Sequence, residues 1–299
     1  MKNKIKKNFF SKVFNFLIKK YLSFPTLYFV MRSKNNFVKN LYINFWVSIA
    51  KRKKHFYKFF FEEKNIDIYD NISFDIKEKI ENININCLEI LERNGILIIE
   101  NALSKENQNQ IIEQFNKINI KDNRNLIKND TVIKYFEESD LDNFKDLRKL
   151  SDYFTDKIYG KPLKSFAEFY IHSSLKIPEI TVNGDNNLHV DRFLPNMKLY
   201  YSPFNISEND APFCYSLGSH KINNQYLKFV KNSKLFSEAE IESKPFIKNS
   251  REITCKANSL VIALTNGFHG RKPFLKKTIR KLVFLQYHKS FNKISLLLN

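Results

Sequence analysis

Two short segments of the chain hold side chains that suit metal chemistry. The first, residues 187–191, contains a His-x-Asp pair, His189 and Asp191. Residues i and i+2 of a strand point to the same face, so we predict that these two side chains converge on one ion. His269 follows an apolar stretch at 259–264 and supplies a third donor. A surface His–Asp pair and a buried structural histidine are the alternatives.

Two imidazoles and one carboxylate on one face of a metal form the facial triad of non-haem Fe(II) sites. Such a triad leaves three coordination positions open. A bidentate 2-oxo acid fills two of them and O2 fills the third. The sequence therefore predicts an Fe(II) site with His189, Asp191 and His269 as metal ligands, which act in catalysis through iron.

Arg280 lies in an apolar segment, with Ile279 before it and residues 282–284 after it. An arginine inside a fold requires an anionic partner. A dicarboxylate that accepts a bidentate contact would suit it. A structural salt bridge is the alternative, and Arg271 and Lys281 are rival cations nearby.

The order of these motifs resembles the phytanoyl-CoA dioxygenase family of 2-oxoglutarate oxygenases. The resemblance covers residues 82–289 and includes a turn at 208–212, a Gly-Ser-His motif at 218–220, and Arg280 eleven residues beyond His269. The sequence departs from the family at Asp210, where Gly is usual, and at Leu217, where Pro is usual. We expect Asn209 to take the positive φ that the turn needs.

The resemblance implies an α+β fold with a mainly β core, a double-stranded β-helix (a jelly-roll or cupin-like barrel) with flanking helices. It implies Fe(II) as cofactor, 2-oxoglutarate and O2 as cosubstrates, and Arg280 as the partner of the distal carboxylate. The expected reaction is hydroxylation of a C–H bond in a small-molecule, lipid or sugar-type substrate, with release of succinate and CO2. A non-catalytic barrel that binds a ligand, or lies peripherally on a membrane, is the alternative.

Four further side chains could line the interior of such a barrel: Tyr170, His172, Lys198 and Tyr200. Alternation along a strand does not reveal which face is the inner one. In the family the Gly-Ser-His histidine shapes a turn, so we expect His220 to be structural. A basic run between Arg271 and Lys281 without any acid would favour an anionic substrate, although it could equally be a solvated loop.

The expected elements agree with a barrel and flanking helices. Hydrophobic periodicity and capping residues predict helices at 82–94, 104–118 and 139–158, with Ser104 as N-cap. Short apolar or alternating runs predict strands at 96–99, 166–172, 197–203, 213–217, 253–255, 259–264 and 279–287. Many short strands separated by turns favour a sandwich or barrel.

Charge divides the chain unevenly. The net charge is +19, yet residues 1–60 hold fifteen Lys and Arg and no acid. We predict a basic, aromatic-rich helical extension at 1–80 and an oxygenase domain at 81–299. Residues 1–60, which begin with an amphipathic basic helix at 1–22, suit contact with the surface of an anionic membrane, and a helical extension packed on the core is the alternative. No nucleic-acid-binding motif is visible, so no specific nucleic-acid partner is expected.

The three cysteines lie far apart in the sequence and do not have metal-type spacing. Such a sparse, odd set fits a reducing compartment. No signal-peptide pattern precedes residue 30, because Lys12 interrupts the apolar run and no small-residue cleavage site follows. We therefore expect a cytoplasmic protein.

Overall fold

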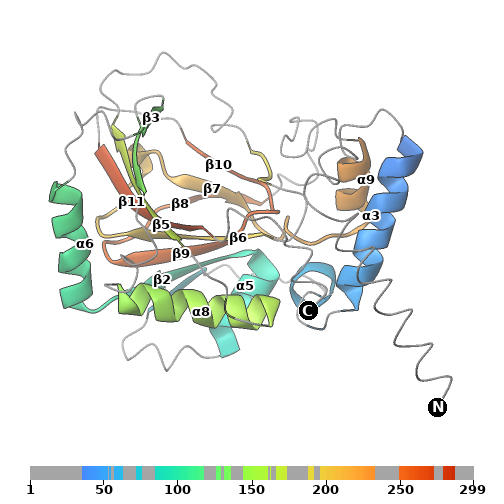
Figure 1. Cartoon of the computed structure of the whole chain (residues 1–299), viewed down its shortest axis with the longest axis horizontal. Helices are drawn as coiled ribbons and strands as arrows, with labels where there is room; N and C mark the ends of the chain where they lie inside the picture. The colour runs from blue at the N-terminus through green and yellow to red at the C-terminus, as the bar shows by residue number, and fades with distance from the viewer. Residues whose placement is uncertain are drawn as a thin grey trace.

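The computed structural model of the 299-residue chain describes the part of the protein in which the helices and strands below lie (Figure 1). These are residues 36–52, 54, 57–62, 72–75, 85–117, 126–128, 131–135, 144–160, 162, 166–173, 188–191, 196–232, 249–272 and 279–286. The predicted helix at 1–22 lies outside them.

Two β-sheets form the centre of the described fold. The larger has eight strands in the order β1-β2-β9-β6-β11-β5-β4-β3, and the smaller has three in the order β10-β7-β8. Strands β1 and β2 are parallel, and the other paired strands of the described residues are antiparallel. The strands are β1 Ser73–Asp75, β2 Ile96–Glu100, β3 Leu126–Lys128, β4 Thr131–Tyr135, β5 Phe166–Ser173, β6 Met197–Ser202, β7 Phe213–Ser216, β8 Ser250–Ile253, β9 Ser259–Leu264, β10 His269–Arg271 and β11 Ile279–Gln286.

The centre of the large sheet, at β2, β9 and β6, is buried on both faces, and alternate residues of these strands belong to two hydrophobic clusters. Leu97 and Ile99 of β2 pack in one cluster with helical residues, whereas Ile96 and Ile98 pack in the other with Tyr215 of the small sheet. This period of two is what a strand between two apolar layers requires. The large sheet therefore has an outer face under helices and an inner face toward the small sheet.

The outer face is covered by α5 Ile85–Asn94, α6 Lys105–Lys117 and α8 Lys145–Tyr159. In Figure 1, α8 runs beneath β2 and β9, and α6 stands at the edge of the molecule. Leu91 of α5, Phe115 of α6 and Phe154 of α8 are fully or almost fully buried there. Gly95 ends α5 with a φ of 77°, a left-handed conformation that glycine adopts without strain.

The predicted helices are found with shifted limits. Ser104 accepts a hydrogen bond from the Asn107 amide at 3.3 Å, as its predicted role as N-cap of α6 requires. The third helix, expected over 139–158, is described as α8 Lys145–Tyr159. Strands β1, β3, β4 and β10 were not predicted, because β1, β3 and β10 are only three residues long and β4 lies in a charged stretch.

Part of the N-terminal region packs on this core. Helix α3 Asn36–Lys51 and the π-helical turn η1 Tyr57–Phe61 precede β1, and α9 Asn224–Asn232 lies beside α3 in Figure 1. Val47 and Phe60 belong to the same buried cluster as α5 and α8. No helix in the described ranges is long and apolar enough to cross a membrane. The boundary at residue 80 stays a prediction.

The turn before β7 differs from the expectation. Glu208–Asp210 forms a 3₁₀ turn, η4, in which the Ser207 amide donates to the Asp210 carboxylate at 2.9 Å. The positive φ belongs to Ala211, at 52°, and not to Asn209, so that part of the prediction was wrong. The Asp210 side chain caps the turn, which glycine could not do.

Candidate metal centre

The His-x-Asp segment is held against the start of β10 by backbone hydrogen bonds. The His189 amide donates to the His269 carbonyl at 2.7 Å, and the His269 amide donates to the His189 carbonyl at 2.8 Å. The Asp191 amide donates to the Thr265 carbonyl at 3.1 Å. The pair was expected within a strand, but His189 makes only an isolated antiparallel bridge to His269, and Asp191 lies in a bend.

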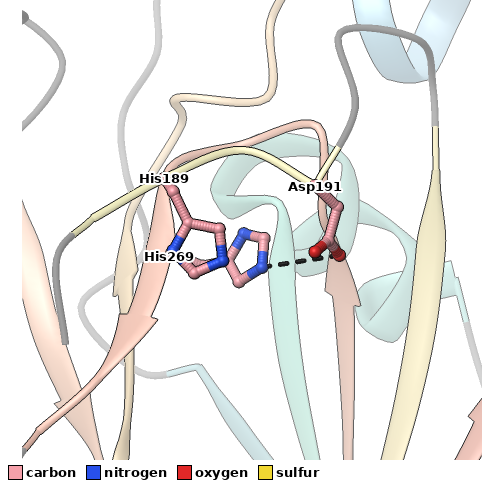
Figure 2. Close-up of side chains that lie close together, drawn as sticks. All are labelled: His189, Asp191 and His269. Atoms are coloured by element: carbon pink, nitrogen blue, oxygen red, sulfur yellow. Dashed lines mark ion pairs between the residues drawn. The ribbon is translucent and has the colours of Figure 1, made fainter. Parts of the chain in front are cut away.

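This pairing brings together the three side chains predicted as metal ligands. One donor atom from each of His189, Asp191 and His269 lies within 4.8 Å of the other two. The two imidazole rings have centroids 4.7 Å apart, and Figure 2 shows both rings and the carboxylate pointing toward one another. Residues eighty positions apart in the sequence thus form one compact cluster of two nitrogen donors and a carboxylate.

The His269 ring is oriented by its own loop. Its Nδ1–H donates to the Gly267 carbonyl at 2.9 Å, so Nε2 is the nitrogen that a metal ion can use. When a histidine binds a metal through one ring nitrogen, a hydrogen bond from the other nitrogen fixes the tautomer and the direction of the ring. The Phe213 ring packs beside it with a centroid distance of 5.5 Å. His269 therefore presents Nε2 toward Asp191.

Asp191 is ionised by its neighbours. The Lys198 Nζ lies 2.7 Å from Asp191 Oδ2, and the His269 Nε2 lies 3.5 Å from the same oxygen. Burial acts to raise the pKa of the Asp191 carboxyl, but the charges of Lys198 and His269 and their hydrogen bonds hold that pKa well below its usual range. The carboxylate is therefore available as a metal ligand at neutral pH.

The chemistry of the donor set fits a divalent metal ion. A carboxylate and two imidazoles are the ligands of the facial triad, and His269 Nε2 already points at the carboxylate oxygen. The residues present are thus suited to hold such an ion, with coordination positions left for further ligands.

Arg280 lies on the inner face of β11 and is almost fully buried, with 7% of its surface exposed. Its Nη1 donates to the Ala211 carbonyl, and its Nε has no hydrogen-bond partner among the described residues. Burial, and then the nearby charge of Arg271, lower the pKa of the Arg280 guanidinium to about 9. A buried cation with an unsatisfied donor requires an anion.

The other four predicted interior residues divide into two pairs. Tyr200 and Lys198 lie on the inner face of β6, where Tyr200 packs on Phe213 at 5.0 Å and on Phe284 at 4.2 Å between ring centroids. On β5, the backbone of Tyr170 pairs with Leu282 and that of His172 with Arg280. The side chains of Tyr170 and His172 lie outside the described part of the structure.

His220 is structural, as expected. It is fully buried, and its Nε2–H donates to the Glu92 carbonyl at 3.0 Å, far from the metal cluster in sequence and on a different element. Its neighbour Ser219 accepts a hydrogen bond from the Phe268 amide at 2.8 Å, one residue before His269. The Gly-Ser-His motif therefore supports the His269 loop instead of contributing a ligand.

Sequence reasoning missed the groups that orient the site. These are the carbonyl of Gly267, the carbonyl of Ala211 and the ring of Phe213. Two are backbone atoms, which residue type does not reveal. A usable signal existed only for Gly267, because a glycine two residues before a ligand often marks a close backbone approach.

No protein-family model matches the sequence, and no curated protein matches it. Solved structures with a similar arrangement include HygX from Streptomyces hygroscopicus with nickel and 2-oxoglutarate bound, at 15% identity over 70% of this chain and 88% of that chain, with a TM-score of 0.45. The carbocyclase SnoK from nogalamycin biosynthesis shares 14% identity over 69% and 84% of the two chains, with a TM-score of 0.49.

The epimerase SnoN, in complex with Fe3+, alpha ketoglutarate and nogalamycin RO, shares 11% identity over 66% of this chain and 80% of its own, with a TM-score of 0.49. The bound groups and activities belong to those proteins. At these identities and TM-scores the likeness assigns no activity to this chain, and the relation to the phytanoyl-CoA dioxygenase family stays a prediction.

Proposed function

We propose that this protein is a non-haem Fe(II) oxygenase that uses 2-oxoglutarate and O2. The observation that supports it most is the convergence of His189, Asp191 and His269 donor atoms within 4.8 Å of one another. A buried, incompletely satisfied Arg280 on the inner face of the same sheet system adds an anion-binding group. This combination matches the needs of a metal-chelating dicarboxylate.

In this proposal each residue has a defined task. His189, Asp191 and His269 hold Fe(II), which supplies the oxidising chemistry once 2-oxoglutarate and O2 are bound. Gly267 holds the His269 ring through Nδ1. Arg280 binds the distal carboxylate of 2-oxoglutarate through its guanidinium donors and so fixes the direction of the dicarboxylate. The aromatic rings of Phe213, Tyr200 and Phe284 exclude water between them.

We infer from the strand order that the fold is a double-stranded β-helix. Strands β9, β6, β11 and β5 are neighbours in the large sheet, β10, β7 and β8 in the small one, and the His189 segment extends the small sheet beyond β10. From β5 to β11, with the His189 segment included, successive segments thus alternate between the sheets except for β7 and β8, which pair with each other, as in a jelly roll. The reaction we propose is hydroxylation of a C–H bond in a small molecule, with 2-oxoglutarate converted to succinate and CO2.

Succinate formation tests the proposal. Purified protein is incubated with Fe(II), ascorbate, O2 and 2-oxoglutarate, beside the variants Asp191→Asn and, as a matched control on α8, Asp156→Asn. Slow succinate release without substrate is expected from the wild type and the control and is expected to vanish in Asp191→Asn. Equal release by all three proteins would show that Asp191 holds no catalytic metal, and the proposal would fail.

A further inference from the structure

Lys198 holds an unusual position for a site that binds a cation. Its ammonium group lies 2.7 Å from Oδ2 of Asp191 and 5.6 Å from the centroid of the Phe284 ring. A divalent ion at Asp191 would therefore meet a second positive charge a few ångströms away. That repulsion weakens metal binding, so support of the carboxylate alone does not explain a lysine here.

The charges of the site point to a missing anion. A divalent ion, Asp191, Lys198 and Arg280 together carry three positive charges, whereas 2-oxoglutarate carries two negative ones. Of the two basic residues, Arg280 is buried to 7% exposure, whereas the Lys198 side chain is 21% exposed, like the Asp191 side chain at 20%. The uncompensated charge therefore belongs to the more solvent-accessible side of the cluster, at Lys198.

We propose that Lys198 binds an anionic group, a carboxylate or a phosphate, of the substrate beside the metal. This inference rests on the proposed function and names the substrate class. In the metal-free protein the ammonium pairs with Asp191. When a metal ion binds Oδ2 of Asp191, the Lys198 ammonium loses this partner. It stays on the inner face of β6 and pairs with the oxyanion of the substrate. The flat ring of Phe284 beneath the Lys198 ammonium keeps it on that face.

A Co(II)-loaded protein with saturating 2-oxoglutarate, kept free of O2, allows a test without turnover. Inorganic phosphate and acetate are titrated separately while the visible absorption of Co(II) is followed, with potassium chloride as the ionic-strength control. We expect a saturable change with a midpoint of about 1–10 mM for one of the two anions. Tighter binding of acetate would identify the substrate group as a carboxylate, and tighter binding of phosphate would identify it as a phosphate.

The variant Lys198→Met is expected to weaken that titration by roughly tenfold or more, because a charge-assisted hydrogen bond is lost. Lys281→Met is the matched control, since Lys281 lies over the Phe115 ring of α6 on the outer side of the same sheet. Without 2-oxoglutarate, Lys198→Met should bind Co(II) several-fold more tightly, as the competing ammonium is gone.

Three results would overturn the inference. These are no saturable response of the wild type to either anion, a response that Lys198→Met keeps, and Co(II) binding that becomes weaker in Lys198→Met. The last would make Lys198 a structural support of Asp191. In each case Co(II) and 2-oxoglutarate still bind to the wild type, which separates this failure from a failure of the proposed function.

Discussion

His189 and His269 exchange two backbone hydrogen bonds, of 2.7 and 2.8 Å, across an isolated antiparallel bridge. This pair of hydrogen bonds positions the two imidazole rings, whose centroids lie 4.7 Å apart, before any ligand binds. Because it uses main-chain atoms, the bridge should survive replacement of either side chain. Substitutions of the ligands therefore test metal binding without dismantling the backbone that positions them.

Asp191→Asn should bind divalent metal far more weakly. Loss of a group that merely orients a ligand costs about 10- to 100-fold in metal affinity, so loss of the charged ligand itself should cost at least about 100-fold. Titration of the metal-free protein with Mn(II), followed by the EPR signal of free Mn(II), measures the difference. Asp156→Asn on α8 is expected to titrate like the wild type. Comparable affinities for Asp191→Asn and the wild type would remove Asp191 from the ligand set.

Gly267→Ala should damage the His269 loop. A Cβ at Gly267 would lie 2.2 Å from Tyr215 Oη and 2.8 Å from Tyr215 Cζ. Both distances are too short for a real contact, so either the buried Tyr215 side chain or the Gly267 backbone would have to shift. Overpacking of this kind costs about 1–3 kcal/mol in the free energy of unfolding. The shift should also loosen the Gly267 carbonyl that orients the His269 ring and thereby weaken Mn(II) binding.

The variant Tyr215→Phe provides the control for that clash. It removes the closest atom, Tyr215 Oη, so Gly267→Ala should cost less in the Tyr215→Phe background than in the wild type. Urea denaturation of the four proteins of this double-mutant cycle measures the coupling. Strictly additive costs would show that the two residues do not compete for space.

Arg280→Met should stabilise the ligand-free protein while it weakens binding of 2-oxoglutarate by at least about tenfold. Burial lowers the pKa of the Arg280 guanidinium to about 9, so the folded state holds that charge at a cost which an apolar chain of similar length avoids. We expect the free energy of unfolding to rise by about 1 kcal/mol, in the range typical of relieved functional strain.

Urea denaturation at pH 7.5 in EDTA checks this stabilisation. The exposed Arg251 on β8 supplies the control, since Arg251→Met should change stability by less than about 0.5 kcal/mol. A loss of stability in Arg280→Met larger than in the control would mean that the Arg280–Ala211 hydrogen bond outweighs the buried charge.

His220 should make the protein sensitive to mild acid. Burial, with the charge of Lys221, lowers the pKa of the His220 imidazole well below its usual range. Above pH ~6.5 the imidazole is neutral in both states, but below it the unfolded chain binds a proton that the folded chain does not. From pH 7.5 to 5.5 this removes about 1.4 kcal/mol from the free energy of unfolding.

The variant His220→Gln isolates that contribution. Glutamine can keep the donor to the Glu92 carbonyl but does not titrate. Urea denaturation at both pH values, in EDTA to keep metal linkage out, should show a smaller loss for His220→Gln than for the wild type by about 1 kcal/mol. Equal losses would assign the acid sensitivity to other groups.

The sequence was most informative where one residue type has few alternative uses. His189, Asp191 and His269 were singled out by type and spacing, and the structure brings their donor atoms together. The sequence predicted β2 and β9 because each contains an unbroken apolar run of four or five residues, and it predicted β6 from its aromatic residues. It failed for β3 and β4, which lie in a charged stretch: β4 pairs with β5 and β3 pairs with β4, and no apolar pattern marks either strand.

Other features depend on contacts that a sequence does not contain. Whether Lys198 faces the inner or the outer side of β6 follows from which sheet packs where, and alternation alone leaves both open. Its 2.7 Å separation from Asp191 is a contact between the His189 segment and β6, which alternation along β6 does not predict. The positive φ of Ala211 was likewise unpredictable, because alanine has no preference for that conformation.

Metal-dependent binding of 2-oxoglutarate tests the central claim most directly. Calorimetric titration of 2-oxoglutarate into the O2-free protein should give binding in the presence of Fe(II) and none, or far weaker binding, in EDTA. His189→Ala should lose the metal-dependent part, and Arg280→Met should bind at least about tenfold more weakly, while Arg251→Met binds like the wild type. The absence of binding to the Fe(II)-loaded wild type, or binding that is the same in EDTA, would contradict the assignment of this site to a 2-oxoglutarate oxygenase.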